Sequence, residues 1–470
     1  MPRLIRPDLR DPVPGDDIAL AGSVTARSRA GFQKILGFRK DVDSVRLVIV
    51  FAALALSAAI LFVSEPRLVF ADYRIAYYPA GSAILNGQSL RPLIERGVTG
   101  FVNIPIIAWL FAPLALFPVA LSAGVFLLCG IAASALACVL LIRVAGLTGW
   151  RSRLFVLLFA ANGPLLYSVK EGNTSHIVLA CLVGGLVLVR RGRNGLAGVL
   201  LASAALMKLP LLLFGLYFVA RRNWSAAAAF AVTLFAAVSL SLLVFGPALH
   251  AVWFDVAVRQ FSGHSLAAFN VQSLQSFVLR LRTPAPALFD WHLLRLSRAE
   301  TLVCTLVAVA FCLTTAFICL RTMLTPQPKS SAASPDPIDL EFMLVVCLAL
   351  LTSPLSWTHY YAWMLIPVAF FIGGRFTAGS LSIGSSPGPL LACVVATLLV
   401  SLPVVFPTGV VSQTTVFHER LGASTYFLGG ILWFSIIAVT ANAEQRRRIF
   451  IARAVPLPGN LLPTCPSAKA

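Results

Sequence analysis

The sequence predicts an all-α polytopic membrane protein, and three observations support this. Of the 470 residues, 58% are hydrophobic and 12% charged, whereas soluble domains have about 45–50% apolar and about 25% charged residues. The mean hydropathy is +0.87. Apolar runs long enough to cross a bilayer, about 20 residues each, recur from residue 46 to residue 443. The embedded part is therefore one continuous body.

The net charge of +19 could indicate a nucleic-acid partner, but the Arg residues lie mainly in short loops and at the ends of apolar runs. Membrane topology explains them better, and no nucleic-acid partner is expected. All nine Cys except Cys465 lie inside apolar runs and no CxxC occurs. We interpret them as buried apolar residues and expect neither disulfides nor a metal site.

Three regions follow from this pattern. Residues 1–45 carry many Lys and Arg, which predicts a disordered segment retained in the cytoplasm. They lack a short apolar core followed by a cleavage site, so no cleaved signal peptide is expected. Residues 46–443 form the transmembrane domain, with outer-face loops at 65–103, 247–299 and 408–423. Residues 444–470, with several prolines, form a cytoplasmic tail.

The first span is expected at 46–64, which places residues 65–103 on the outer side of the membrane. Residues 104–143 are too long for one span and contain Pro105, Pro113 and Pro118. They predict a short interfacial helix over 104–117 and a return span over 119–143. Spans at 154–170 and 175–190 then form a pair with a basic inner end.

Segment 195–220 has Arg at both ends and Lys208-Leu209-Pro210 in its middle. A single crossing would put Arg on both membrane faces, so a re-entrant hairpin is favoured over a single span. Lys208 is then expected on the cytoplasmic side, without a catalytic role. Further spans are expected at 224–246, 300–320, 339–357, 360–374, 388–407 and 424–443, giving about ten crossings, with a flexible cytoplasmic linker at 322–337.

One outward-facing acid differs from the others in its surroundings. Asp72 follows an apolar run and precedes Tyr73, Arg74, Tyr77 and Tyr78. If residues 72–86 form a helix along the interface, its aromatic rings anchor it at headgroup depth, and the carboxylate stands where a lipid headgroup lies. The alternative is that Asp72 only caps this helix.

Three further polar clusters are expected on the outer side. Asn173 follows Gly172 in an outer turn, and Asn270 and Gln272 lie in a later loop. His359 lies between Trp357 and Tyr360, where histidine is more often a packed interface residue than a catalytic one. Each cluster alone is a weak signal.

Together these places resemble the family 87 glycosyltransferases, which include bacterial mannosyltransferases and an arabinofuranosyltransferase. The resemblance covers about residues 46–443 and is carried by the order of its motifs. These are Asp72 with Tyr77, the turn around Pro105, Gly172-Asn173, Lys208 with Pro210, Asn270-Val271-Gln272-Ser273, and Ser353-Pro354-Leu355-Ser356-Trp357-Thr358-His359-Tyr360. Asn103, Ile104, Thr358 and Tyr360 depart from the family pattern.

The resemblance implies a C-type glycosyltransferase fold with about 10–12 transmembrane helices and short periplasmic interfacial helices. It implies transfer of mannose or arabinofuranose from a polyprenyl-phosphate donor to a glycolipid or polysaccharide acceptor, with inversion, at the periplasmic face of a bacterial plasma membrane. Asp72 is the expected base and His359 the second catalytic residue. The expected substrate-binding residues are Arg74, Tyr77, Tyr78, Asn173, Asn270, Gln272, Trp357 and Tyr360. No cofactor or metal is expected.

Two other functions stay open from the residues. The first is a transporter or lipid flippase, which Lys208-Leu209-Pro210 in the middle of an apolar segment would suit. The apolar runs contain almost no acids, which argues against ion-coupled transport. A polysaccharide polymerase or ligase should depend on Arg pairs in outer loops, for which Arg280 and Arg282 are the candidates.

Overall fold

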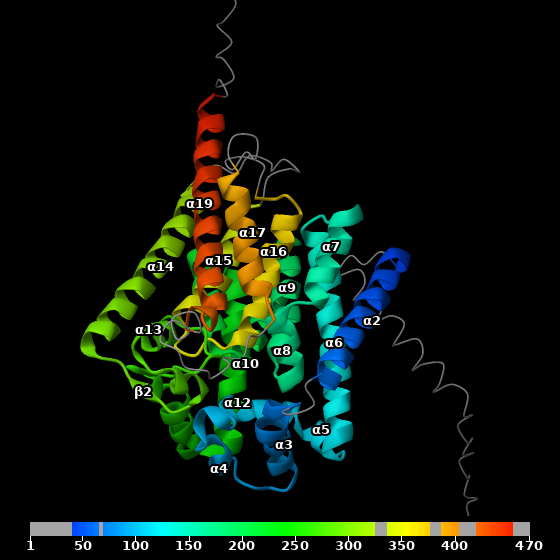
Figure 1. Ribbon diagram of the computed structural model, residues 1–470, viewed down its shortest axis with the longest axis vertical. Helices are drawn as coiled ribbons and strands as arrows, with labels where there is room; N and C mark the ends of the chain where they lie inside the picture. The colour runs from blue at the N-terminus through cyan, green and yellow to red at the C-terminus, as the bar shows by residue number, and fades with distance from the viewer. Residues whose placement is uncertain (1–39, 65–68, 325–335, 377–386, 404–419, 455–470) are drawn as a thin grey trace, which may run out of the picture.

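A computed structural model describes residues 40–64, 69–324, 336–376, 387–403 and 420–454. Its architecture confirms the all-α polytopic prediction. In the described ranges, extended structure is limited to an antiparallel pair of two-residue strands, β1 (His264–Ser265) and β2 (Leu294–Arg295), and one isolated bridge. Figure 1 shows long helices side by side, with short helices gathered at the lower end of the bundle.

Among the described residues, five helices are long and apolar enough to cross a membrane. A sixth candidate is a pair bent by 42°, which matches the span predicted at 154–170. The five are α2 (Lys40–Ser64), α6 (Val119–Val144), α12 (Trp224–Ala257), α14 (Arg298–Leu324) and α19 (Thr425–Ala454), and the bent pair is α7 (Gly149–Ala160) with α8 (Gly163–Glu171). The other predicted crossings form shorter helices, α9 (Ser175–Arg190), α15 (Pro337–Thr352), α16 (Leu365–Ile372) and α17 (Gly388–Ser401).

Both ends of the helical body extend beyond the predicted limits. α2 begins at Lys40, because Asp43 in its first turns is 1% exposed and pairs with Arg143, 3.4 Å away on α6. Such a paired carboxylate can be buried inside a helical bundle. The predicted N-terminal segment up to residue 39 and the tail from residue 455 lie outside the described residues, as do 325–335 of the linker and 408–419 of the last outer loop.

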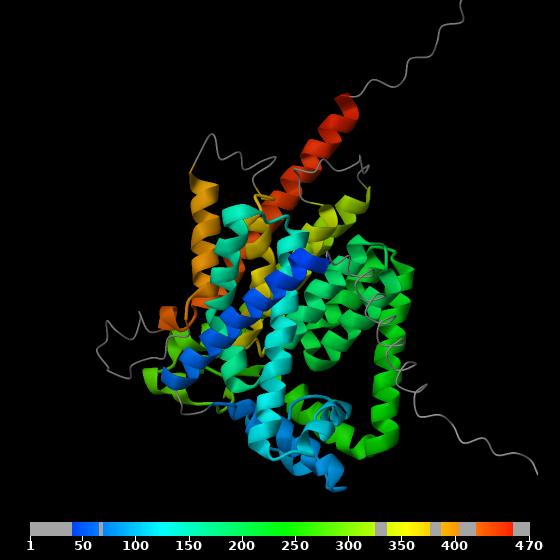
Figure 2. The ribbon, with the colours of Figure 1, turned by 90° about the vertical axis from the view of Figure 1, so that its right-hand side faces the viewer.

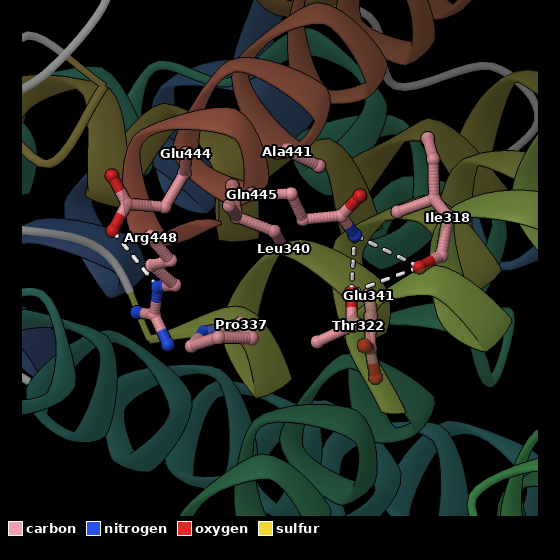
Figure 3. Close-up of a pocket in the computed structure, with 9 residues that line it drawn as sticks. All are labelled: Ile318, Thr322, Pro337, Leu340, Glu341, Ala441, Glu444, Gln445 and Arg448. Atoms are coloured by element: carbon pink, nitrogen blue, oxygen red, sulfur yellow. Dashed lines mark hydrogen bonds and ion pairs between the residues drawn. The ribbon is translucent and has the colours of Figure 1, made fainter. Parts of the chain in front are cut away.

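α19 continues through the predicted tail start at residue 444, because polar side chains there are buried against other helices. Gln445 donates from Nε2 to the carbonyl oxygen of Ile318 on α14, at 2.9 Å. Arg448 donates to Glu444 at 3.0 Å. Figure 3 shows these residues around a cavity of ≈ 10 Å³, which has room for about one water and not for a sugar.

The segment predicted as a hairpin folds back on itself. Its arms are α10 (Asn194–Met207) and α11 (Leu213–Ala220), joined by the 3-10 turn η4 (Leu209–Leu212). Gly198 on α10 and Gly215 on α11 both lie against Phe230 of α12. In one straight helix these glycines would be about 25 Å apart. The arms therefore run antiparallel, and Lys208 lies at the tip.

Short elements form the end of the bundle that carries the predicted surface helix. The stretch at 72–86 consists of a π-helical turn, η1 (Tyr73–Tyr77), and α3 (Tyr78–Leu85). Around it lie α4 (Arg91–Ile94), η2 (Gly97–Thr99), η3 (Pro105–Leu110) and α5 (Ala112–Ala115), followed later in the chain by η5 (Arg259–Phe261), α13 (Leu274–Arg282), η6 (Ala285–Phe289) and η7 (Thr358–Met364). Figure 2 shows the last part of α12 turning beneath the bundle, at Gly246, whose φ of 74° breaks the helix before Pro247.

Candidate active site

Asp72 lies at the entrance of the π-turn, but its side chain does not cap that turn. The turn has no side-chain cap from Asp72 among the described contacts, so the capping alternative is not supported. The preceding Phe70 has a φ of 59°, a conformation that bulky residues rarely adopt. Its backbone N–H donates to the carbonyl oxygen of Lys170 at 2.7 Å. π-turns and strained residues occur often at functional sites.

Asn173 joins Asp72 to Lys208. Its Nδ2 donates to Oδ2 of Asp72 at 2.6 Å, and its Oδ1 accepts from Nζ of Lys208 at 3.0 Å. The backbone N–H and the hydroxyl of Ser175 also donate to Oδ1, at 3.1 and 3.0 Å. These hydrogen bonds fix the orientation of the Asn173 amide. Asn173 therefore positions Asp72 and Lys208, and its amide is not free to bind a substrate in this arrangement.

The prediction that Lys208 lies on the opposite side of the membrane from Asp72 was wrong. The hairpin does fold back as expected, but its tip reaches the cluster around Asp72, where the Lys208 ammonium lies 4.7 Å from the ring centroid of Tyr360. Asn103, between η2 and η3, donates to the carbonyl oxygen of Met207 at 2.9 Å and so fixes the tip. Lys208 therefore belongs to the candidate site.

His359 lies next to Tyr360, with ring centroids 5.1 Å apart. It is 4% exposed, and neither Nδ1 nor Nε2 has a hydrogen-bond partner among the residues the structure describes. The ring is parallel to that of Trp357, with centroids 6.2 Å apart and an interplanar angle of 7°, and Tyr167 lies at 6.2 Å. A buried imidazole without partners loses its interactions with water, which makes it a candidate for binding a ligand.

An apolar groove opens beside this cluster, with a volume of ≈ 570 Å³, in the range of about 300–1,000 Å³ for small-molecule sites. Lys208, Trp357 and Tyr360 lie on its wall. Leu212 and Leu216, further along the hairpin, also line it and are 42% and 69% exposed. The groove thus leads from an exposed apolar surface to a buried ammonium.

Several predicted substrate-binding residues lie elsewhere. Arg74 is exposed, and residues two apart on a helical turn do not face each other, so it points away from Asp72. Tyr78 donates to the carbonyl oxygen of Phe117 at 3.1 Å. The Gln272 side-chain amide donates to the carbonyl oxygens of Phe269 and Ala423.

Two more predicted residues are near the site but occupied by protein contacts. The ring of Tyr77 stacks on Phe111 with centroids 4.6 Å apart, although Tyr77 is close enough to Asp72 for their charges to interact. Asn270 donates to the hydroxyl of Tyr167 at 3.3 Å, and its Oδ1 accepts from Trp291 at 3.1 Å. Both residues support the walls of the site.

Sequence reasoning assigned no role to two residues that the structure brings to the site. Glu171 is half-buried and interacts electrostatically with Asp72. Tyr167, one helical turn earlier on α8, lies against His359. The spacing of Tyr167 and Glu171 on one helix face could have paired them, but nothing in the sequence pointed that face toward Asp72.

The helices and this cluster define a polytopic membrane protein whose polar site lies at the end of an apolar groove. In a comparison with sequence models of protein families, the model of glycosyltransferase family 87 matches residues 101–354, which is more than half of the chain. The chain therefore belongs to this family and is a glycosyltransferase. The matched range includes Asn173 and Lys208. No curated protein matches the chain.

Proposed function

We propose that this glycosyltransferase moves mannose or arabinofuranose from a polyprenyl-phosphate donor to a lipid-linked or polysaccharide acceptor, with inversion at the anomeric carbon. The reaction takes place at the outer face of a bacterial plasma membrane. The observation that carries the proposal is the chain of contacts Asp72–Asn173–Lys208 at the inner end of the apolar groove.

Asp72 is the proposed general base. Its carboxylate takes the proton of the acceptor hydroxyl while the acceptor oxygen attacks the anomeric carbon and the bond from that carbon to the phosphate oxygen breaks. Burial raises the pKa of Asp72, whereas the hydrogen bond from Asn173 and the charge of Lys208 oppose that rise. A carboxylate with a raised pKa is a better proton acceptor near neutral pH.

Lys208 and His359 are the proposed partners of the leaving phosphate. The phosphate departs with the electrons of the broken bond, and the Lys208 ammonium offsets its negative charge. A ring N–H of His359 can donate to a phosphate oxygen, since neither ring nitrogen is engaged by a described residue. Trp357 lines the groove together with Lys208 and offers a flat face for the sugar, whereas the Tyr360 ring is already in contact with Lys208 and stacked on Trp363.

The groove is the proposed site of the polyprenyl chain. An apolar wall beside an ammonium matches a ligand that carries a phosphate on a hydrocarbon chain. The exposed Leu212 and Leu216 would let that chain enter from the bilayer. The outer-face orientation follows from the basic residues of the N-terminal segment and of the hairpin ends, which favour the cytoplasm.

The test is sugar transfer from radiolabelled polyprenyl phosphate mannose, and separately arabinose, by membranes that contain the wild type or Asp72→Asn. Transfer by the wild type that the substitution abolishes, at an equal protein level, supports the proposal and identifies the donor. Equal transfer by both proteins would exclude Asp72 as the base. Absence of transfer from either donor, with a control enzyme active in the same membranes, would contradict the donor class.

A further inference from the structure

A second cavity lies at the opposite end of the bundle from Asp72, where α6 and α9 end. Its volume is ≈ 260 Å³, and it is lined by Leu140, Arg143, Val144, Val187, Arg190 and Arg191. Arg143 and Arg190 lie in the last turns of their helices, and Arg191 follows α9 directly. Three guanidinium groups from two helices thus converge on one space, and the lining contains no acid.

Two of the arginines that line the cavity are paired with buried acids that are not part of its lining. Nη1 of Arg143 is 3.4 Å from Oδ2 of Asp43, and Nε of Arg190 is 3.4 Å from Oδ1 of Asp339. Both acids are 1% exposed. These ion pairs hold two of the three guanidinium groups that line the cavity.

The third arginine, Arg191, is exposed and lines the cavity directly after Arg190 in the chain. Arg191 lies close enough to Arg143 for their positive charges to repel each other. Asp336 and Arg375 are further charged neighbours of Asp339, and Arg375 also contacts the carbonyl oxygen of Ala145 at 3.4 Å. An anion inside the cavity would relieve the repulsion between Arg143 and Arg191.

The rest of the lining is apolar. Leu140 and Val187 lie about one turn before the arginines on the same helices, toward the membrane interior, and Val144 directly follows Arg143. The retention of positive residues in the cytoplasm requires only that they lie near this membrane face. It does not require them to converge on a cavity with an apolar wall. Basic pockets between helices on the cytoplasmic side are known to bind anionic headgroups.

We propose that this cavity binds the phosphate group of an anionic phospholipid of the inner leaflet. The guanidinium groups of Arg143, Arg190 and Arg191 would bind the phosphate oxygens, since planar guanidinium suits phosphate geometry. The apolar wall would contact the start of an acyl chain. Because Asp43 is on α2 and Asp339 on α15, the bound lipid ties together the inner ends of four helices.

The test compares thermal unfolding of the full-length protein, purified in detergent, after addition of phosphatidylglycerol, phosphatidylcholine or inorganic phosphate. Native mass spectrometry counts the lipids that remain bound. The test variant is Arg191→Gln, which removes a lining charge without breaking the pair of Arg190 with Asp339. The matched control is Arg193→Gln, an exposed arginine two positions away that does not line the cavity.

Phosphatidylglycerol is expected to raise the Tm of the wild type and of Arg193→Gln, and to remain bound to both. In Arg191→Gln its apparent affinity should fall about tenfold. An equal Tm rise with phosphatidylcholine, or equal losses in the two variants, would overturn the proposal. A full Tm rise with inorganic phosphate alone would overturn the lipid as the source of the phosphate.

Discussion

The side-chain amide of Asn173 separates Asp72 from Lys208. It donates to the carboxylate at 2.6 Å and accepts from the ammonium at 3.0 Å. No ion pair joins Asp72 directly to Lys208 within the described residues. Each charge is therefore positioned by a neutral group and stays available on its other side.

The first prediction concerns the Asn173 amide. Asn173→Ala removes two hydrogen bonds to charged groups, each worth about 1.5–3 kcal/mol. We expect kcat to fall about 10- to 100-fold, because both Asp72 and Lys208 lose their orientation. The fall in kcat is measured by steady-state kinetics with the labelled donor. Asn86→Ala is the control, since Asn86 is exposed and bonds to Ser82 of its own helix. Unchanged kcat in Asn173→Ala would exclude the positioning role.

A second prediction follows from the raised pKa of Asp72. Burial is the main cause of that rise, and the base works only when ionised, so kcat/KM should fall as the pH decreases through this pKa. The charge of Lys208 lowers the pKa of Asp72. In Lys208→Met this effect is lost, so the acid limb of the pH profile should move to higher pH. A limb that stays in place would show that another group titrates.

A third prediction is that substitution of His359 mainly affects activity, whereas substitution of His176 mainly affects stability. His359 has no partner among the described residues, whereas Nδ1 of His176 is 2.9 Å from the hydroxyl of Ser168. His359→Asn should lower kcat about 10²-fold with little change in Tm. His176→Asn should mainly lower Tm, because it disrupts a buried hydrogen bond. Activity and thermal unfolding of both variants are compared. A large Tm loss in His359→Asn with normal activity would make His359 structural.

A fourth prediction concerns the turn before Asn173. Gly172 has a φ of 66°, and a Cβ there would lie 2.7 Å from Cβ of Tyr73. Gly192 has a φ of 68° with nothing within 4 Å of such a Cβ. Gly192→Ala should cost about 1–2 kcal/mol of unfolding free energy from backbone strain. Gly172→Ala should cost more, because Tyr73 and the site loop must move. Equal losses in chemical unfolding would contradict the close contact.

A fifth prediction concerns the groove. Leu212→Trp puts a larger ring at the exposed part of its lining, so KM for a long-chain polyprenyl donor should rise while KM for a short-chain analogue changes little. Val219→Trp is the control, because Val219 is 49% exposed on α11, the arm that follows Leu212, and does not line the groove. KM values for the two donors give the comparison. The same KM increase for both donors would argue against a chain in the groove.

The spans could be predicted because hydropathy and chain length determine them almost directly. The hairpin could also be predicted, from the arginines that flank it. The depth of its tip could not, since apolar content does not report how far a re-entrant segment extends. The hydrogen bond from Asn103 to Met207, between residues 104 positions apart, fixes the tip. Lys208 was consequently separated from the site to which it belongs.

The candidate site could be predicted only in part. Asp72, Asn173, His359, Trp357 and Tyr360 come together as expected, because their motifs follow spans whose ends meet at the same side. Arg74 and Tyr78 were grouped with them because they closely follow Asp72 in the sequence, and Gln272 because its loop matches a motif of the family. The π-turn and the hydrogen bonds of Gln272 direct these side chains elsewhere, and such local geometry has no signature in composition.

The contacts of Asn173 also constrain the biosynthesis of the protein. Asp72 is synthesised first, and its hydrogen-bond partner follows 101 residues later. Lys208 comes after a further 35 residues, at the tip of a segment that must fold back. The carboxylate therefore has neither partner while the early helices insert. The order of translation itself keeps an incomplete chain from assembling the Asp72–Asn173–Lys208 contacts.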